Sequence, residues 1–328
     1  MAKGDALLQV KDLRTYIYGR DGTRVVKAVD GVSFELKRGE TLGIIGESGC
    51  GKSMTAGSIM RILPAAARIV SGEIYFNGEN LLKKSEAEMR RMRGEQMSMI
   101  LQDPMVSLDP LFSVGSQLAE PLRLHRGLSG AALTERMTGL LGSMSIPSPE
   151  QRLKQFPHQM SGGMLQRIVG AIAISCDPQL LIADEPTTAL DPTVQAQFLD
   201  LLETLRDSKN LSLIVVTHDF GVAARLCDRV MVMYAGRIVE MGPIRQIFDA
   251  PRHPYTQALL GSIPDATDFG AGRLKSIDGQ PPDLGSLPPG CPFAPRCPQV
   301  MDRCRRDYPT EFRAGPEQIA SCWRVFAQ

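Results

Sequence analysis

The sequence predicts an α/β fold with a buried parallel sheet, and three stretches carry this prediction. "GETLGIIGESGCGKSMTAGSIMRIL" reads as an apolar strand, a glycine-rich turn and a helix that starts near Lys52. "LLIADEP" and "LSLIVVTHD" each contain the continuous apolar run of a strand that is buried on both faces. Strand, glycine-rich loop and helix in this order are typical of a nucleotide-binding core.

Other elements follow from local patterns. "ALLQVKDLRTYIY" and "VVKAVDGVSFEL" alternate apolar and polar residues around the turn-like "GRDGT", so they predict antiparallel strands. Helical spacing over residues 110–155 predicts a helical insert at about 104–165. The Pro- and Gly-rich "SIDGQPPDLGSLPPGCPFAPRCP" predicts a loop-dominated C-terminal appendix. We therefore expect one domain over 1–250 and a second region over 251–328.

Composition excludes several classes of protein. Of the 328 residues, 43% are hydrophobic and 22% are charged, and the net charge of +1 gives no reason to expect a nucleic-acid partner. No apolar run reaches the roughly 18 residues of a membrane span, and "MAKGDALLQV" lacks the core of a signal peptide. We expect the chain to stay in the cytosol.

The glycine-rich loop matches the pattern G-x-x-x-x-G-K-[ST] over Gly46–Ser53. In such a loop backbone amides surround phosphates, Lys52 reaches the β and γ oxygens, and the Ser53 hydroxyl ligates Mg²⁺. Cys50 is most simply a small residue at a variable position of this loop; alternatively, because a helix N-terminus lowers a thiol pKa, it is open to alkylation in the absence of nucleotide. The predicted nucleotide contacts are Gly46, Glu47, Ser48, Gly49, Cys50, Gly51, Lys52, Ser53 and Met54.

Two acids end the apolar run of "LLIADEP". Asp184 is placed to hold Mg²⁺ through water, and the next carboxylate, Glu185, to polarise an attacking water. A second phosphate site is indicated by "MSGGMLQR", where Ser161, Gly162 and Gly163 precede a predicted helix with free amides.

These motifs, together with "ILQDP", "TTALDPT" and "VVTHD", resemble the ATP-binding subunits of ABC transporters over roughly residues 7–250. The resemblance implies an ABC ATPase fold: a RecA-like P-loop core with an antiparallel β subdomain and a helical subdomain. "APRHPYTQALL" and the appendix after it are similar to the ATPase subunits of dipeptide, oligopeptide and nickel importers, which extends the resemblance over essentially the whole chain.

Site roles follow from the resemblance by motif. Lys52, Glu185 and His218 are the expected catalytic residues, and Asp191 marks the D-loop. Ser53, Gln102 and Asp184 are expected around Mg²⁺. Tyr16 or Tyr18 is expected to stack on the adenine ring. The family signature acts on the ATP of a partner subunit, here through Ser161, Gly162, Gly163 and Gln166. Met160 and Met164 depart from the usual leucine and glutamine of that signature but leave its Ser-Gly-Gly intact.

Four cysteines in the appendix, with the spacing C-x5-C-x6-C-x17-C, form a candidate metal site. Four thiolates hold a [4Fe–4S] cluster or a tetrahedral zinc, although neither the close zinc pairs nor the ferredoxin spacings are present. The related importer subunits favour the iron–sulfur cluster, with zinc or no metal as alternatives. The expected ligands are Cys291, Cys297, Cys304 and Cys322.

The resemblance implies an ATPase that drives an importer, and the expected cargo is a di- or oligopeptide, with nickel or another small solute as the alternative. The implied partners are two transmembrane permease subunits, a second and different ABC ATPase, and an extracytoplasmic solute-binding protein. The chain would be a peripheral protein on the cytoplasmic face of the bacterial inner membrane. A soluble ABC ATPase of translation or DNA repair is less favoured, because such proteins carry two cassettes or a long coiled-coil insertion.

Overall fold

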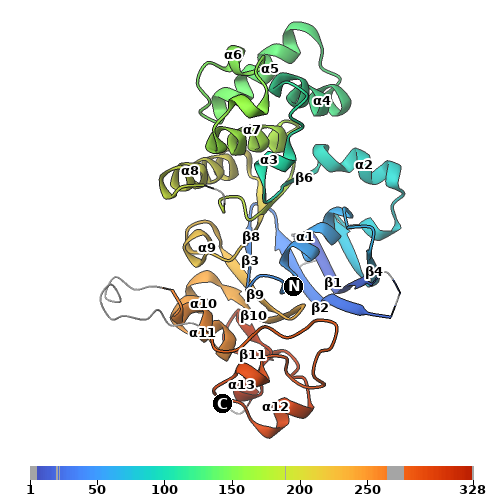
Figure 1. Cartoon of the computed structure of the whole chain (residues 1–328), viewed down its shortest axis with the longest axis vertical. Helices are drawn as coiled ribbons and strands as arrows, with labels where there is room; N and C mark the ends of the chain where they lie inside the picture. Colours follow the sequence, from blue (N-terminus) through green and yellow to red (C-terminus); the bar gives the residue numbers. More distant parts are fainter. Residues whose placement is uncertain (1–5, 20, 22, 189, 264–276, 327–328) are drawn as a thin grey trace. The chain divides into compact units, whose positions relative to one another are not determined.

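The computed structural model describes residues 6–19, 21, 23–188, 190–263 and 277–326, and it forms two compact units (Figure 1). The first unit comprises Met1–Leu36, Thr41–Leu82 and Thr217–Gln328. The second comprises Lys37–Glu40 and Lys83–Val216. This division differs from the boundary predicted at residue 250, because the C-terminal region belongs to the same unit as the glycine-rich loop.

A four-stranded sheet in the first unit has the order β2-β1-β4-β5, and β1 runs antiparallel to β4. Apolar side chains of β1 and β4 such as Leu8 and Ile74 are fully buried, which explains the alternating pattern of β1. The two predicted N-terminal strands are confirmed, whereas β4 and β5 were not anticipated. The strands are β1 (Ala6–Tyr18), β2 (Val25–Lys37), β4 (Ala67–Phe76) and β5 (Glu79–Asn80).

The second sheet of the first unit is built around β3, which pairs in parallel with β9. β10 pairs antiparallel with β9 and with β12, and β12 pairs with β11. The C-terminal region therefore adds strands to the sheet that carries the glycine-rich loop. The elements are β3 (Thr41–Ile45), β9 (Arg229–Tyr234), β10 (Arg237–Pro243), β11 (Phe312–Arg313), β12 (Ile319–Ala320), α1 (Lys52–Met60), α9 (Phe220–Leu226), α10 (Ile244–Asp249) and α11 (Pro254–Gly261).

In the second unit β7 pairs in parallel with β6 and with β8. All five residues of β7 are buried, as its unbroken apolar run predicts. Helices α3 to α6 lie within the range predicted for the helical insert, and α4 ends at the predicted "RGLSG" break. The elements are β6 (Met97–Ile100), β7 (Leu180–Asp184), β8 (Ser212–Thr217), α2 (Glu86–Glu95), α3 (Pro104–Ser107), α4 (Val114–Arg126), α5 (Gly130–Ser143), α6 (Pro149–Arg152), α7 (Gly162–Ile174) and α8 (Pro192–Lys209), with short 3₁₀ turns at Leu81–Lys83 and Pro157–Gln159.

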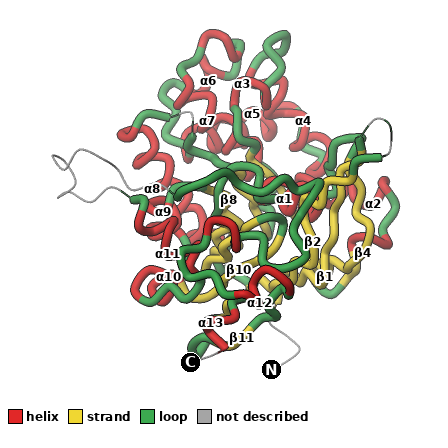
Figure 2. The backbone as a smooth tube through the Cα atoms, turned by 60° about the horizontal axis from the view of Figure 1, so that its bottom comes forward, coloured by secondary structure: helices red, strands yellow, loops and turns green. Residues whose placement is uncertain are grey.

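The C-terminal region consists mostly of loops, with short helices between them (Figure 2). Its short helices are a 3₁₀ turn at Ala294–Arg296, α12 (Asp302–Arg306) and α13 (Trp323–Phe326). The fully buried carboxylate of Glu240 in β10 accepts the backbone N–H groups of Arg252 and His253 and the side-chain amide of Gln318. These bonds fix both ends of the region to the sheet. None of the helices in the described ranges is both long and apolar enough to cross a lipid bilayer.

Candidate nucleotide site

The glycine-rich loop connects β3 to α1, as the sequence predicts. Gly51 has φ +108°, and a Cβ there would lie 2.2 Å from the carbonyl oxygen of Ala28. At Gly46 a Cβ would lie 2.3 Å from the carbonyl oxygen of Met233. Only glycine allows the backbone to pass these two points, so the loop is shaped by its packing against neighbouring backbone.

Lys52 is the first residue of α1, and its side chain is buried in the loop. Its ammonium group donates to the carbonyls of Gly46 at 2.8 Å and of Glu47 at 3.1 Å, and the residue is 5% exposed. Ser53 follows on the exposed side of the same helical turn. A buried ammonium group, an exposed hydroxyl and a helix N-terminus fit the phosphates and Mg²⁺ of a nucleotide.

Cys50 does not have the reactivity expected from the sequence. The residue is 5% exposed, and burial raises the pKa of its thiol to about 11. The positive charge of Lys52 acts in the opposite direction but does not offset the burial. The prediction of an alkylatable thiolate is therefore wrong, since burial outweighs the effect of the helix N-terminus.

Tyr16 and Tyr18 share one face of β1 by strand alternation, whereas Thr15 faces Ser58 of α1 at 2.8 Å. The Tyr16 hydroxyl donates to Asp30 at 3.0 Å. Burial chiefly, and then this bond, raise the pKa of Tyr16. Tyr16 is thus held within a group of charged side chains, while Tyr18 is half-buried at the end of the strand.

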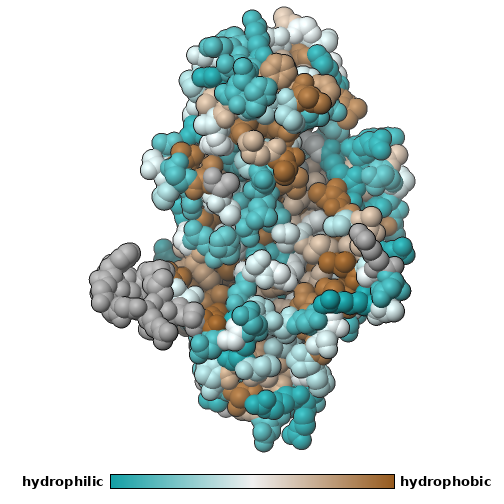
Figure 3. All heavy atoms as spheres, viewed as in Figure 1, coloured by the Kyte–Doolittle hydropathy of each residue, from teal (hydrophilic) through white to brown (hydrophobic). Residues whose placement is uncertain are grey.

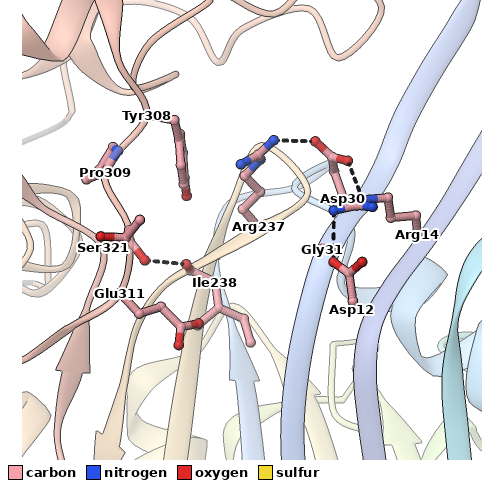
Figure 4. Close-up of a pocket in the computed structure, with 11 residues that line it drawn as sticks. Asp12, Arg14, Asp30, Gly31, Arg237, Ile238, Tyr308, Pro309, Glu311 and Ser321 are labelled. Atoms are coloured by element: carbon pink, nitrogen blue, oxygen red, sulfur yellow. Dashed lines mark hydrogen bonds and ion pairs between the residues drawn. The ribbon is translucent and has the colours of Figure 1, made fainter.

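That charged group borders a cavity of about 360 Å³ between β1, β2, β10 and the C-terminal region (Figure 4). Asp30 accepts from Arg237 at 2.6 Å and lies 3.3 Å from the Arg14 guanidinium. Burial acts to raise the pKa of Asp30, but the hydrogen bond and charge of Arg237 prevail, so that the pKa lies below its usual range. The Arg237 guanidinium also lies 4.2 Å from the ring centre of Tyr308. These contacts join the C-terminal region to the N-terminal strands.

The predicted acidic residues lie in the second unit, where β7 ends. Asp184 is the last residue of β7 and is 6% exposed. Glu185 follows with φ +46°, a conformation that costs energy for a residue other than glycine and is common at functional sites. Its Oε2 accepts from the Gln102 side-chain amide at 3.0 Å and from the Thr188 hydroxyl at 3.1 Å. The structure thereby brings two predicted residues, Gln102 and Glu185, into direct contact.

The signature residues line a separate cavity of about 530 Å³ in the second unit. Ser161 is the N-cap of α7, and its hydroxyl accepts from the Met164 N–H at 3.4 Å. A Cβ at Gly163 would lie 2.6 Å from Val194, whereas a Cβ at Gly162 would meet nothing within 4 Å. Gly163 is therefore required by packing, while the space at Gly162 is open to a ligand.

Asp191 lines the same cavity and caps α8 by accepting the N–H groups of Thr193 and Val194. Gln166 is not among the residues that line the cavity, because it lies on the buried face of α7 with 1% exposure. Arg167 lines the cavity instead and is held by Gln197 at 2.6 Å. Because a helix turns by about 100° per residue, Gln166 and Arg167 point to different faces of α7, the first buried and the second lining the cavity.

His218 belongs to the first unit, directly follows the last residue of β8 in the chain, and has an exposed side chain. Asp219, the next residue, caps α9 by accepting the N–H groups of Gly221 and Val222. The predicted strand, histidine and helix are present in this order.

The four C-terminal cysteines influence one another electrostatically, since burial and then the other three thiols raise the pKa of Cys291 to about 11. Throughout the described parts of the chain, however, no three His, Cys, Asp or Glu side chains are arranged to hold a metal ion. The residues as placed thus fit neither a zinc ion nor any other single metal ion.

Comparison with known proteins gives two matching family models. Residues 29–188 match the model described as ABC transporter, and residues 239–304 match that described as Oligopeptide/dipeptide transporter, C-terminal region. The second match covers the "HPYTQALL" segment and the first three cysteines of the appendix.

Relatives match over nearly the full length. The dipeptide transport ATP-binding protein DppD of Bacillus subtilis is 49% identical over 97% of this chain and 95% of its own. The oligopeptide transport ATP-binding protein OppD of Salmonella typhimurium is 48% identical over 98% of this chain and 94% of its own.

Among solved structures, the dimeric post-hydrolysis state of the ATP-binding cassette MJ0796 with ADP and Pi has a TM-score of 0.66. It is 26% identical and covers 73% of this chain and 99% of its own. CbiO1 of Clostridium perfringens, part of a transporter complex, has a TM-score of 0.62 at 28% identity, over 75% of this chain and 92% of its own.

Proposed function

This chain belongs to the family of ABC transporter ATP-binding proteins, in the branch of the dipeptide and oligopeptide transport proteins, and we propose that it is the ATP-hydrolysing subunit of a peptide importer. The observation that carries the proposal is the presence of the phosphate-loop, acidic and signature motifs in a chain nearly half identical to such subunits. An inactive cassette would not need to keep Lys52, Asp184, Glu185 and His218.

ATP with Mg²⁺ is the expected ligand of the site. Lys52 and the loop amides would bind the phosphates, Ser53 and Asp184 would hold Mg²⁺, and Gln102 would lie beside it. The metal would neutralise the charge that develops on the transferred phosphoryl group. Glu185 would accept a proton from the attacking water, and His218 would orient the γ-phosphate. Tyr18 is the better candidate for the adenine, because Tyr16 is bound to Asp30.

The signature cavity supports action on a neighbouring subunit's ATP. Gly162 leaves open space at the N-terminus of α7, where free amides and the helix dipole favour phosphate. The related cassette MJ0796 is dimeric with ADP and Pi in its solved structure. We propose that this chain also forms a pair, arranged head to tail, with a second, different ATPase chain as the partner.

An exposed apolar segment supports binding to membrane subunits. Residues 101–112 present several large apolar side chains to solvent, among them Val106 at 76% and Leu111 at 80% exposure. Hydrophobic surface is visible among the helices of the second unit (Figure 3). Apolar residues gathered beside Gln102 suit a docking site for a permease subunit, which would hold the chain peripherally at the cytoplasmic face of the membrane.

The [4Fe–4S] cluster remains a prediction from the importer resemblance. Iron assay after anaerobic purification tests it, with Cys297→Ser as the variant that should lose iron. An iron-free parent protein would remove the prediction.

The function is tested by reconstituting the membrane assembly with its binding protein in liposomes and measuring ATP hydrolysis. We expect short peptides to stimulate hydrolysis and nickel ions to have no effect. Stimulation by nickel alone would support the alternative cargo, and an assembly without ATPase activity would contradict the proposed enzyme.

A further inference from the structure

Two side chains from the C-terminal region hold Glu47, the second residue of the phosphate loop. The Arg296 guanidinium donates to Glu47 Oε2 at 2.8 Å through Nη1 and to Oε1 at 3.0 Å through Nη2. This is the bidentate fork between an arginine and a carboxylate, a strong and directional contact. The Glu47 N–H donates to the hydroxyl oxygen of Tyr255 at 2.9 Å. All three residues belong to the first unit.

Arg296 is itself fixed in position. Its side chain is 4% exposed, its Nε donates to the Asp278 carbonyl at 2.9 Å, and its Nη1 donates to the Tyr234 hydroxyl at 3.3 Å. The guanidinium lies about 6 Å from the ring centres of Tyr234 and Phe293. Hydrogen bonding to Glu47 is the main cause that raises the pKa of Arg296 further above its usual value. The positive charge is therefore permanent and fixed beside the loop.

Tyr255 is equally well fixed. The residue is fully buried, and its ring centre lies 4.5 Å from that of Tyr234 and 5.3 Å from that of Phe293. The Glu47 N–H thus points at the C-terminal region, where the Tyr255 hydroxyl accepts its hydrogen bond.

A second stretch of the C-terminal region also borders the loop. Pro281, Pro282 and Leu284 line a cavity of about 160 Å³ together with the loop residues from Glu47 to Cys50. The Leu284 carbonyl accepts the Lys27 N–H at 3.2 Å, which ties this stretch to β2. The loop is thus enclosed on this side by residues that follow position 250.

A carboxylate within a phosphate loop is unfavourable for an anionic ligand. Glu47 provides one of the two carbonyls that hold the Lys52 ammonium, so its side chain is attached to the backbone that surrounds the phosphates. An uncompensated negative charge there would repel a triphosphate. Salt would screen this repulsion only weakly, because the Glu47 side chain is largely buried. The Arg296 guanidinium cancels that charge.

We propose that Arg296 is a positioning residue for ATP binding, which neutralises Glu47 and fixes the phosphate loop from the C-terminal region. The inference rests on the proposed ATPase function. It makes the C-terminal region part of the nucleotide site, although nothing in the sequence around "FAPRCP" indicates such a contact.

The test is the affinity of the assembled complex for a fluorescent ATP analogue, together with KM and kcat for ATP. Arg296→Gln should weaken binding and raise KM by roughly tenfold, with a much smaller change in kcat, because it leaves the Glu47 charge uncompensated. Removing that charge as well, in the double variant Glu47→Gln with Arg296→Gln, should restore most of the affinity. Arg296→Lys should retain most of it, because the positive charge remains.

Arg24→Gln is the matched control. Arg24 pairs with Asp283 of the same C-terminal stretch at 2.9 Å, but their side chains are 63% and 55% exposed. We expect less than about a twofold change, because exposed ion pairs contribute little.

Unchanged affinity in Arg296→Gln would overturn the inference. Equal weakening in the single and double variants would overturn the charge argument and leave only a packing role. If Arg296→Gln does not fold, then Arg296→Lys and the double variant still decide the outcome. If the unaltered complex binds no ATP, the proposed function itself has failed, so the two failures are distinguishable.

Discussion

Glu185 and Gln102 meet at the end of β7, and this contact joins the predicted base to a residue predicted to lie beside Mg²⁺. Glu185 has a left-handed backbone conformation that directs its carboxylate to Gln102 and Thr188. The Glu185 side chain is held by two hydrogen bonds and is therefore pre-organised, since it loses little conformational entropy when a substrate binds.

Glu185→Gln should retain ATP binding and lose hydrolysis, because an amide has the shape of the carboxylate but cannot accept the proton of the attacking water. We expect a fall in kcat of at least ~100-fold, the usual contribution of a general base. Steady-state hydrolysis and nucleotide binding by the assembled complex measure both effects. The exposed Glu86→Gln in α2 serves as control, and a kcat unaffected by Glu185→Gln would exclude this residue as the base.

Gly162 and Gly163 form a matched pair of neighbouring glycines with different surroundings. Gly163→Ala places a methyl group 2.6 Å from Val194, so we expect a lower midpoint of thermal unfolding, by a few degrees. Gly162→Ala meets no atom of its own chain within 4 Å and should leave the midpoint unchanged, while lowering ATP hydrolysis by the assembled dimer. A Gly162→Ala variant with full activity would contradict close approach of a phosphate.

At the residue level, motif spacing predicts Lys52, Asp184, Glu185, Ser161 and Asp191 where strands or helices begin or end, and each of them lies at such a position, while their roles stay predictions. Gln166 is the exception, since the signature pattern does not specify which helix face is buried. Sequence reasoning also missed Tyr255 and Arg296, because their contact with Glu47 spans more than 200 positions of the chain.

At the scale of elements, the C-terminal region is held to β10 and β9 by buried polar groups and aromatic rings. His253 is the N-cap of α11, and its Nδ1 accepts the Tyr255 N–H at 3.0 Å. Burial lowers the pKa of His253 to about 3, so the folded protein keeps this ring neutral. The capping bond requires that neutral form, because a protonated imidazole has no acceptor nitrogen.

This lowered pKa predicts acid sensitivity of the fold. Below the unfolded pKa of about 6.5, His253 binds a proton in the unfolded chain but not in the folded one. The free energy of unfolding therefore falls as pH falls from about 6.5 toward 3. The full contribution is on the order of 5 kcal/mol. His253→Asn keeps an acceptor for the Tyr255 N–H and should flatten the decline in thermal midpoint between pH 6.5 and 4.5. His158→Asn, at an exposed position, is the control, and parallel slopes in all three proteins would contradict the account.

The elements that the sequence predicts best are those with a clear hydrophobic pattern: the alternation in β1, the continuous apolar runs of β3, β7 and β8, and the helical spacing of the insert. β4 and β6 escaped prediction because each has exposed or polar positions that interrupt its pattern. The C-terminal strands β11 and β12 are two residues each and exist only through pairing, β12 with β10 and β11 with β12, so local propensity could not reveal them.

At the scale of the whole molecule, each chain carries one phosphate loop and one signature cavity, and we propose that each signature acts on the ATP of the neighbouring subunit. Ser161→Arg fills the signature cavity with a long cationic side chain. We expect it to abolish labelling of the partner subunit's phosphate loop by a photo-crosslinking ATP analogue, while labelling of its own loop persists.

Ser129→Arg is the control for this prediction, because Ser129 precedes α5 in the same unit without lining that cavity. Loss of labelling confined to the variant's own loop would show that the head-to-tail arrangement is wrong.

The central claim, that this chain energises a peptide importer, is tested most directly by identifying its companions. The tagged chain is purified from detergent-solubilised membranes and the proteins that accompany it are identified by mass spectrometry. The account predicts two polytopic permease subunits, a second ATPase and a peptide-binding protein. Recovery of the chain alone, or with ribosomes or DNA, would contradict it and would favour a soluble ABC ATPase instead.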